Sequence, residues 1–227
     1  NESTVPTHKT DWWPWGGIVG DVYLVETPND YIRNAYLQLN PDNFSEAVFK
    51  LQMATKSSRQ KVILEIPELK YKEEFRTDSS GFIQENIAIS PELWSPSNPK
   101  LYKVIISSQN ESISDEIGFR SIQTRGQKVY LNNNEIKFKG IAMHSEPIGE
   151  PGPAYSKEHF KKLLATAADL NINFVRAAHY PYTRHLAKIA DQIGLMVWEE
   201  IPVYWNIDWE NPDTLKIAKD QLKLIFF

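Results

Sequence analysis

Short runs in which apolar and polar residues alternate dominate the chain from residue 31 to about residue 120. The clearest are 49–53 and 62–66, where every second side chain is apolar. Because successive side chains of a strand point to opposite faces, this period predicts strands that are buried on one face. Pro, Ser, Asn and Asp separate the runs. About six or seven short strands in about ninety residues are typical of an immunoglobulin-like antiparallel β-sandwich.

The period changes after about residue 125, where apolar runs begin to alternate with helical patterns. In the first of these patterns, Phe160, Leu164 and Ala167 fall on one face of a helix. Three strand–helix units in succession predict parallel strands joined by helical crossovers. We expect strands at 138–143, 173–178 and 195–201, helices that begin near Ser156, Thr183 and Asn211, and an end of the second helix at Gly194.

Composition and charge exclude several classes of protein. The 25 basic and 29 acidic side chains leave a net charge of -4, so nothing indicates a surface for nucleic acid or for an anionic membrane. The apolar runs are far shorter than the roughly 20 residues of a membrane-spanning helix. Because the chain has no Cys, it has no disulfide, no thiolate nucleophile and no Cys-ligated zinc. We therefore expect neither nucleic acid nor a membrane as a partner.

The cellular compartment stays open. The first ten residues lack the charged and apolar regions of a signal peptide. The chain does not begin with Met, so a signal could have been lost upstream, and the lack of Cys fits the cytosol, the periplasm and secretion alike. A periplasmic or secreted location is favoured slightly over the cytoplasm.

The candidate chemistry lies where the three expected parallel strands end. In βα architectures, functional groups gather at the carboxyl ends of the strands and in the loops that follow. A single His at such an end is more often part of a hydrogen-bonded scaffold than a ligand or a catalyst, whereas two at equivalent ends are a stronger functional signal. The residues are His144 and Glu146 after the first strand, Arg176, His179 and Tyr180 in and after the second, and Glu199, Glu200, Tyr204 and Trp205 after the third.

Arg176 lies within an apolar strand, where a guanidinium requires an acidic partner. Glu199 or Glu200 is the expected partner, and a purely structural ion pair stays open beside a functional one. The two glutamates are adjacent, so they point to opposite faces and cannot face each other across a substrate. A zinc site of His144, His179 and a glutamate is disfavoured because no short ligand spacing such as H-E-x-x-H occurs. A serine triad is also disfavoured, because no Ser lies in a G-x-S-x-G turn.

The aromatic residues allow both structural and binding interpretations. Trp94 in the sandwich region and Trp198 in the third parallel strand are expected in the core. Trp205 lies with Tyr204 and Trp209 in the loop after that strand, where rings could present a flat apolar face to a ligand or pack on the loop's own domain. The N-terminal segment adds a further aromatic loop with Trp12, Trp13 and Trp15.

Six motifs follow one another along nearly the whole chain. They are D-W-W-P-W-G-G-I-V-G-D-V-Y-L-V (11–25), L-W-S-P-S-N-P-K-L-Y (93–102), I-G-F-R-S-I (117–122), L-N-N-N-E-I-K-F-K-G-I-A-M-H (131–144), N-F-V-R-A-A-H-Y-P (173–181) and A-D-Q-I-G-L-M-V-W-E-E-I-P (190–202). This succession resembles glycoside hydrolase family 2, which contains β-galactosidases, β-glucuronidases and β-mannosidases. The motifs are highly specific for the family and only weakly specific for the substrate.

The resemblance implies a multidomain β plus α/β fold. Residues 1–27 would end a jelly-roll sugar-binding domain, and residues 28–121 would form the immunoglobulin-like β-sandwich. Residues 122–227 would form the first three β-α units of a (β/α)8 TIM barrel, the domain that carries catalysis. Because such a barrel alone takes about 250 residues, the chain is expected to be a fragment.

The resemblance also implies a retaining exo-β-glycosidase that acts on β-galactosides or β-glucuronides, with β-galactosidase favoured. Such an enzyme uses two Glu residues whose carboxyl groups lie roughly 5 to 5.5 Å apart. In the family, the acid/base lies in an N-E pair at the end of the fourth barrel strand, and the nucleophile lies on the seventh. We expect both beyond the chain end, so no catalytic residue is assigned and the fragment is expected to be inactive.

What the resemblance carries over to this chain is a supporting role. His144 and His179 would hydrogen-bond sugar hydroxyls, and Arg176 would steady the carboxylate of the nucleophile. Glu200 matches the acidic residue that ends the third barrel strand. The expected substrate-binding residues are His144, His179, Arg176, Glu200 and Trp205.

One departure from the family pattern lies at Ala142 and Met143, where many relatives have an Asn and an Arg. No metal and no cofactor are expected. The expected partner is a β-linked oligosaccharide or glycoside, and a homo-oligomer stays open. The alternative is a non-catalytic carbohydrate-binding or structural interaction module, in which the sandwich and the partial barrel form a recognition surface.

Overall fold

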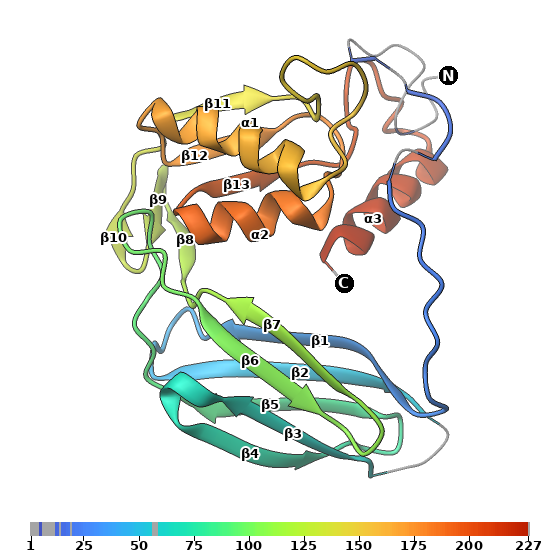
Figure 1. Ribbon diagram of the computed structural model, residues 1–227, viewed down its shortest axis with the longest axis vertical. Coiled ribbons are helices and arrows are strands. Elements are labelled where there is room, and N and C mark those ends of the chain that lie inside the picture. The colour runs from blue at the N-terminus through green and yellow to red at the C-terminus, as the bar shows by residue number, and fades with distance from the viewer. Residues whose placement is uncertain (1–4, 6–11, 14, 19, 56–58, 227) are drawn as a thin grey trace. The chain divides into compact units, whose positions relative to one another are not determined.

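The computed structural model of the protein describes residues 5, 12–13, 15–18, 20–55 and 59–226 (Figure 1). The chain divides into two compact units. The sandwich unit is Leu24–Lys137, and the α/β unit combines Asn1–Tyr23 with Phe138–Phe227. Within the described part of the chain, no helix combines the length and the apolar character that crossing a membrane requires.

Two antiparallel sheets build the sandwich unit, with strand orders β1-β2-β5 and β4-β3-β6-β7. The alternation in the sequence appears directly in β2, where every second side chain is buried. The β-sandwich expected from that alternation is confirmed. The strands are β1 (Tyr31–Leu39), β2 (Glu46–Ala54), β3 (Lys61–Ile66), β4 (Tyr71–Arg76), β5 (Phe82–Ala88), β6 (Tyr102–Ser107) and β7 (Ser112–Ile117), and a 3-10 turn, Pro67–Leu69, joins β3 to β4.

The core of the sandwich is built from the inward side chains of both sheets, among them Phe49, Leu64 and Phe119. Trp94 is fully buried, as expected, and its backbone N–H donates to the carbonyl oxygen of Phe119 at 2.9 Å. At Gly118, a Cβ atom would lie 2.6 Å from the Trp94 ring. Only glycine therefore lets the backbone approach this tryptophan so closely.

A small three-stranded antiparallel sheet follows the sandwich strands and belongs to the same unit. The side chain of Asn132 connects it to the sandwich, because its Nδ2 donates to the carbonyl oxygen of Trp94 at 2.9 Å and its Oδ1 accepts from the N–H of Ser121 at 3.0 Å. The strands are β8 (Ile122–Arg125), β9 (Lys128–Leu131) and β10 (Asn134–Glu135).

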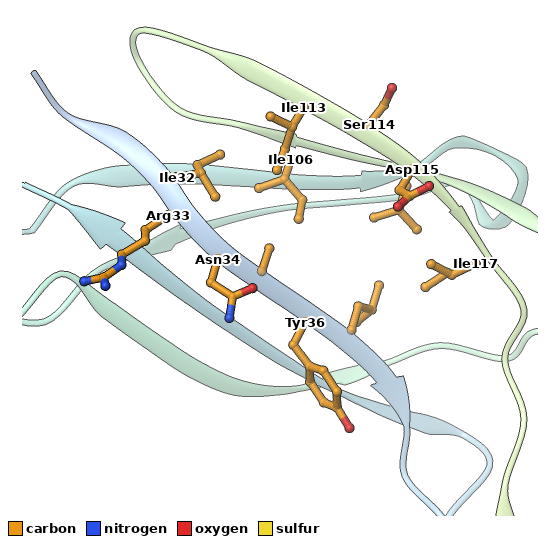
Figure 2. Close-up of a pocket in the computed structure, with 12 residues that line it drawn as sticks. Ile32, Arg33, Asn34, Tyr36, Ile106, Ile113, Ser114, Asp115 and Ile117 are labelled. Atoms are coloured by element: carbon orange, nitrogen blue, oxygen red, sulfur yellow. The ribbon is translucent and has the colours of Figure 1, made fainter. Parts of the chain in front are cut away.

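A cavity of about 310 Å³ opens between β1 and β7, the strands at one edge of each sandwich sheet. Figure 2 shows Ile32, Ile106 and Ile113 pointing into the same space, whereas the side chain of Arg33 points away. A register shift interrupts the pairing of β1 with β2 at this point. The carboxylate of Glu111, in the turn before β7, accepts a hydrogen bond from the N–H of Ile32.

The α/β unit confirms the expected succession of three strand–helix units. Its parallel sheet has the order β11-β12-β13, and helices α1 and α2 pack on one face of it (Figure 1). The strands are shorter than the sequence pattern suggests. The elements are β11 (Gly140–Met143), α1 (Lys157–Asp169), β12 (Phe174–Ala177), α2 (Arg184–Ile193), β13 (Met196–Glu199) and α3 (Pro212–Phe226).

The helix boundaries follow the capping residues seen in the sequence. The Ser156 side chain accepts a hydrogen bond from the N–H of His159 at the start of α1. Gly194 ends α2 in the left-handed conformation, with φ of 81°. At the start of α3, Asn211 Oδ1 accepts from the N–H of Asp213 at 2.9 Å.

The two faces of the parallel sheet differ in character. Val175 and Ala177 are fully buried against α1 and α2. Arg176 lies between them in sequence, so it points to the opposite face, and its register partner in β13 is Trp198. Trp198, which the sequence places in the core, lies on this opposite face, and its side chain is 58% exposed in these 227 residues.

Candidate functional site

The site lies at the carboxyl ends of the three parallel strands, as the sequence predicts. His144 follows β11, and Arg176 and His179 lie in and after β12, while Glu200 directly follows β13. The His144 and His179 rings approach edge to face, with centroids 5.6 Å apart. Parallel pairing brings these residues together because neighbouring strands end at the same edge of the sheet.

Glu200, and not Glu199, is the partner of Arg176. Arg176 Nε lies 2.5 Å from Glu200 Oε1 and Arg176 Nη2 lies 3.1 Å from Oε2, so the contact is bidentate. The alternation of side chains explains the choice, because Glu200 follows Trp198 by two positions and shares the face of Arg176. The ion pair expected from the sequence is therefore present, and Glu200 is the acidic partner.

His179 completes the charged network. Its Nδ1 lies 3.1 Å from Glu200 Oε2 and 3.2 Å from Arg176 Nη2. A carboxylate can only accept, so the hydrogen-bond network assigns the proton on this side of the ring to Nδ1, which donates to Glu200. That tautomer leaves Nε2 of a neutral His179 as an acceptor for a ligand hydroxyl.

The hydrogen bonds of the network favour the charged forms of Glu200 and Arg176. Burial by itself would raise the pKa of the Glu200 carboxyl, but hydrogen bonds from Arg176 and His179 outweigh it and hold that pKa below its ordinary value. The hydrogen bond to Glu200 raises the pKa of Arg176. In contrast, burial raises the pKa of Glu199. The two neighbouring carboxyl groups thus occupy opposite electrostatic environments.

Two stacked tyrosines hold the loops that carry the histidines. The rings of Tyr180 and Tyr182 have centroids 5.4 Å apart and lie within 14° of parallel. The Tyr182 hydroxyl lies 2.6 Å from the carbonyl oxygen of Met143 and 3.1 Å from that of Ala178, so its proton is shared between the ends of β11 and β12. The Tyr180 hydroxyl accepts from the N–H of Ser145 at 3.1 Å.

These contacts fix the backbone on both sides of His144 and next to His179. Sequence reasoning singled out Tyr180 but missed Tyr182. The feature that could have indicated Tyr182 is its position in the same loop, two residues after Tyr180. Burial raises the pKa of both hydroxyl groups, so they remain protonated donors over the ordinary pH range.

Aromatic rings enclose His179. Tyr204 lies against it with ring centroids 4.5 Å apart. The ring of Trp12, which comes from the N-terminal part of the α/β unit, lies 5.9 Å from the His179 ring between centroids. Trp12 also contacts Tyr180 and Tyr204, each with centroids 5.4 Å apart. The structure places Trp205 farther out, with its ring edge-on to Tyr204 at 5.8 Å and 64% of its surface exposed.

Beside His144, a cavity of about 520 Å³ is lined by three tryptophans and Glu146. Sequence reasoning did not connect the N-terminal tryptophans with this site, because more than a hundred residues separate the two segments. Among the residues that the structure describes, no cluster of three His, Asp or Glu side chains could hold a metal ion. The described lining residues are Trp12, Trp13, Trp15, His144 and Glu146.

Comparison with known families identifies the two regions. Residues 31–120 match glycosyl hydrolases family 2, and residues 122–213 match the TIM barrel domain of the same family. The chain belongs to glycoside hydrolase family 2. Its sandwich and its parallel β-α units are therefore the immunoglobulin-like domain and the start of the TIM barrel of a family 2 protein, as the motifs indicated.

Relatives within family 2 carry two kinds of name. A β-galactosidase of Halalkalibacterium halodurans is 28% identical over 88% of this chain and 21% of its own length. A putative β-glucuronidase of Formosa agariphila is 28% identical over 87% of this chain and 26% of its own length. The chain thus spans about a fifth to a quarter of these relatives.

The fold is also that of a solved family 2 structure. The crystal structure of Parabacteroides merdae β-glucuronidase superposes with a TM-score of 0.80 and 19% sequence identity. The match covers 100% of this chain and 30% of that one. At this identity, the likeness establishes the fold of the family 2 fragment and leaves its activity to the site itself.

Proposed function

We propose that this chain is part of a retaining exo-β-glycosidase that hydrolyses O-glycosidic bonds, with β-galactosides as its substrates. Membership of glycoside hydrolase family 2 supports the reaction, and the β-galactosidase of Halalkalibacterium halodurans is one of the relatives that supports the substrate. On this proposal, residues 1–27 end a jelly-roll domain, residues 28–121 form the sandwich domain, and residues 122–227 begin the catalytic barrel.

The observation that carries the proposal is the charged network at the strand ends. Arg176, His179 and Glu200 hold one another within 3.2 Å, and His144 lies beside them. A purely structural ion pair would not need a second imidazole, nor an aromatic enclosure open to a cavity. Fixed donors and acceptors beside aromatic rings are the chemistry that recognises a sugar, whose hydroxyls alternate with apolar C–H faces.

Each residue has a distinct role in the proposal. His144 and His179 hydrogen-bond sugar hydroxyls, and Glu200 fixes both His179 and Arg176 in place. Arg176, which is 43% exposed on its side chain, keeps donors available to steady a second carboxylate, that of the nucleophile. Trp205 offers its exposed ring to the sugar.

The two catalytic glutamates are proposed to lie in chain outside these 227 residues, about 5 to 5.5 Å apart as retention of configuration requires. Neither Glu199 nor Glu200 is assigned to catalysis, because Glu200 is engaged by Arg176 and Glu199 points to the helix-covered face. The chain alone is therefore expected to be inactive.

The test measures turnover of a chromogenic β-galactoside and a β-glucuronide by the 227-residue chain and by the protein translated from its complete reading frame. The complete protein should hydrolyse the β-galactoside, and Arg176→Met should lower kcat/KM by about 10²-fold through loss of positioning. Arg76→Met is the matched control, because Arg76 also contacts a glutamate but lies on the sandwich surface. Turnover by the 227-residue chain would contradict the assignment of the glutamates.

The second candidate is a non-catalytic carbohydrate-binding or structural interaction module. The cavity beside His144 favours it, since aromatic walls bind sugar without any catalytic carboxylate. A complete protein that binds a glycoside but hydrolyses none of the chromogenic substrates would support this candidate over the glycosidase.

A further inference from the structure

Ser145 directly follows His144 and uses each of its polar groups in a hydrogen bond. Its N–H donates to the Tyr180 hydroxyl at 3.1 Å, and its carbonyl oxygen accepts from the N–H of Ala154 at 2.7 Å. Its own hydroxyl donates to the carbonyl oxygen of Ala154 at 3.0 Å. Ser145 is 8% exposed and Ala154 is 4% exposed, so these bonds are sheltered from water. Ser145 therefore joins the end of β11 to the loop after β12 and to the segment before α1.

The two hydrogen bonds between Ser145 and Ala154 close the base of a loop, residues 146–153. Within this loop, Gly149 and Gly152 have φ values of 77° and 108°. Glycine adopts such positive values without the steric cost that a side chain would bring. The chain can therefore leave the base, turn and return to it without strain, and the base itself stays fixed by Ser145.

A side-chain contact fixes the tip of this loop on α1. Glu150 Oε1 lies 3.0 Å from Lys162 Nζ, and Glu150 Oε2 lies 3.4 Å from His159 Nε2. The hydrogen bond from Lys162 holds the pKa of Glu150 below its ordinary value, and His159 adds to this effect. His159 Nδ1 accepts from the N–H of Tyr155 at 3.4 Å, so the hydrogen-bond network assigns the proton of a neutral His159 to Nε2, which faces Glu150. Because Glu150 and Lys162 are both about half exposed, this contact is the weaker of the two ties.

The imidazole of His144 has no comparable tie of its own. Its Nδ1 is buried and makes no hydrogen bond within the described part of the chain. The rings of His179 and Tyr180 lie beside it, with centroids 5.6 Å and 6.0 Å away. A functional histidine is commonly oriented by a hydrogen bond to the ring nitrogen that faces the protein. Without such a bond, the position of the His144 ring depends on its backbone, which the neighbouring Ser145 fixes.

We infer that Ser145 is a positioning residue, which holds the His144 imidazole in the site through the backbone rather than through the ring. The Glu150 contact is a second and weaker restraint on the same loop. The inference deepens the proposed function and rests on it, because the proposed function gives His144 its ligand. Ser145 acts through His144, so its removal should change where the imidazole lies and how well the substrate binds.

The first test uses the 227-residue chain and needs no turnover. Ser145→Ala removes the hydroxyl that donates to Ala154 and should shift the imidazole nitrogen resonances of His144 in NMR spectra, which His144→Gln assigns. Ser145→Thr keeps a hydroxyl and should bring these resonances back toward those of the unaltered chain. Thr166→Val is the matched control, because the exposed Thr166 hydroxyl also donates to a backbone carbonyl oxygen of the α/β unit, that of Lys162 at 3.1 Å. Unchanged His144 resonances in Ser145→Ala, or an equal shift in Thr166→Val, would overturn the inference.

Glu150→Gln tests the restraint at the tip of the loop. It should shift the same His144 resonances by a smaller amount than Ser145→Ala does. Glu158→Gln should leave them in place, because Glu158 is also an exposed partner of a lysine on α1, Lys161 at 3.9 Å, but does not belong to the loop. Since the Glu150 contact is exposed, this variant reports on the loop even if Ser145→Ala lowers the stability of the chain. An absent shift, or one as large as that of Ser145→Ala, would contradict the assignment of the weaker restraint.

The second test uses the complete protein and a chromogenic β-galactoside. Ser145→Ala should raise KM about fivefold and leave kcat within about twofold, because a displaced His144 weakens binding of the ground state and of the transition state alike. A merely structural role would reduce the amount of folded enzyme, which lowers the apparent kcat at an unchanged KM. Ser145→Thr should restore KM, and Thr166→Val should not alter it. An unchanged KM in Ser145→Ala would overturn the inference.

The two tests separate this inference from the proposed function. A complete protein that hydrolyses no glycoside would refute the proposed glycosidase, while shifted His144 resonances in the 227-residue chain would still support Ser145 as the residue that positions this imidazole. Conversely, normal hydrolysis with an unchanged KM in Ser145→Ala would refute the positioning role and leave the glycosidase in place.

Discussion

The sandwich unit and the α/β unit use their large side chains in different ways. In the sandwich unit, aromatic residues such as Trp94 and Phe49 are fully buried, and charged residues pair at the surface, as Lys61 and Glu74 do. In the α/β unit, one sheet face is buried under helices while the other carries Trp198 exposed beside the Arg176 network.

The two units therefore differ in where their apolar and charged side chains lie. The sandwich packs one face of each of its two sheets into its own core, and its ion pairs lie in solvent, where they contribute little. The α/β unit instead keeps a charged, partly buried network and several exposed rings at one edge of its sheet.

Replacement of one tryptophan in each unit should give the largest difference in stability between the two units. Trp94→Ala leaves a large cavity in the interior of the sandwich unit and should lower the free energy of unfolding by about 3 to 5 kcal/mol. Trp198→Ala removes a side chain that is 58% exposed and should cost far less. Urea unfolding of both variants measures the difference, and comparable losses of unfolding free energy would show that the two units do not differ as described.

Removal of one carboxylate from the network should have an intermediate effect. Glu200→Gln takes a charge from Arg176 and His179 and should lower the free energy of unfolding at pH 7 by about 1 to 2 kcal/mol, given the partial exposure of Arg176. Glu74→Gln removes an exposed partner of Lys61 and should cost less.

The pH dependence gives this prediction its sign. The folded-state pKa of Glu200 is lowered, so its contribution is present above the ordinary Glu pKa of about 4.3 and is lost as the pH falls through the folded value. The stability gap between the unaltered protein and Glu200→Gln should therefore shrink in acid. A gap that stays constant from pH 7 to acid would contradict the charged network.

The smallest expected effect comes from the tyrosine pair. Tyr182→Phe removes the hydroxyl shared by the carbonyl groups of Met143 and Ala178 and should cost about 1 kcal/mol. Amide hydrogen exchange at Ser145 and Ala178 should accelerate, because the ends of β11 and β12 lose a common donor. Tyr155→Phe, in an exposed loop, should leave both rates unchanged.

Local pattern accounts for most of the fold. Alternation in 49–53 and 62–66 specified strands buried on one face, and Ser156 and Gly194 specified where helices begin and end, because these signals act within a few residues. The exposure of Trp198 was not readable in the same way. An apolar strand does not tell which of its faces is covered, and that depends on register with β12.

The site was predictable only in part, for a related reason. Strand ends pointed to His144, Arg176, His179 and Glu200, and the structure brings these four together. The contact of Trp12 with His179 joins positions far apart in sequence, so no periodicity encodes it. The choice between Glu199 and Glu200 needed the register that places Arg176 beside Trp198.

The enclosure of His179 makes the site observable without any label. Its ring lies 4.5 Å from the centre of the Tyr204 ring and 5.9 Å from that of Trp12. The magnetic ring currents of these neighbours displace the resonances of the imidazole protons from their usual positions. Because only five histidines occur in the chain, that displaced signal provides a direct reporter of any event that moves Trp12 or Tyr204.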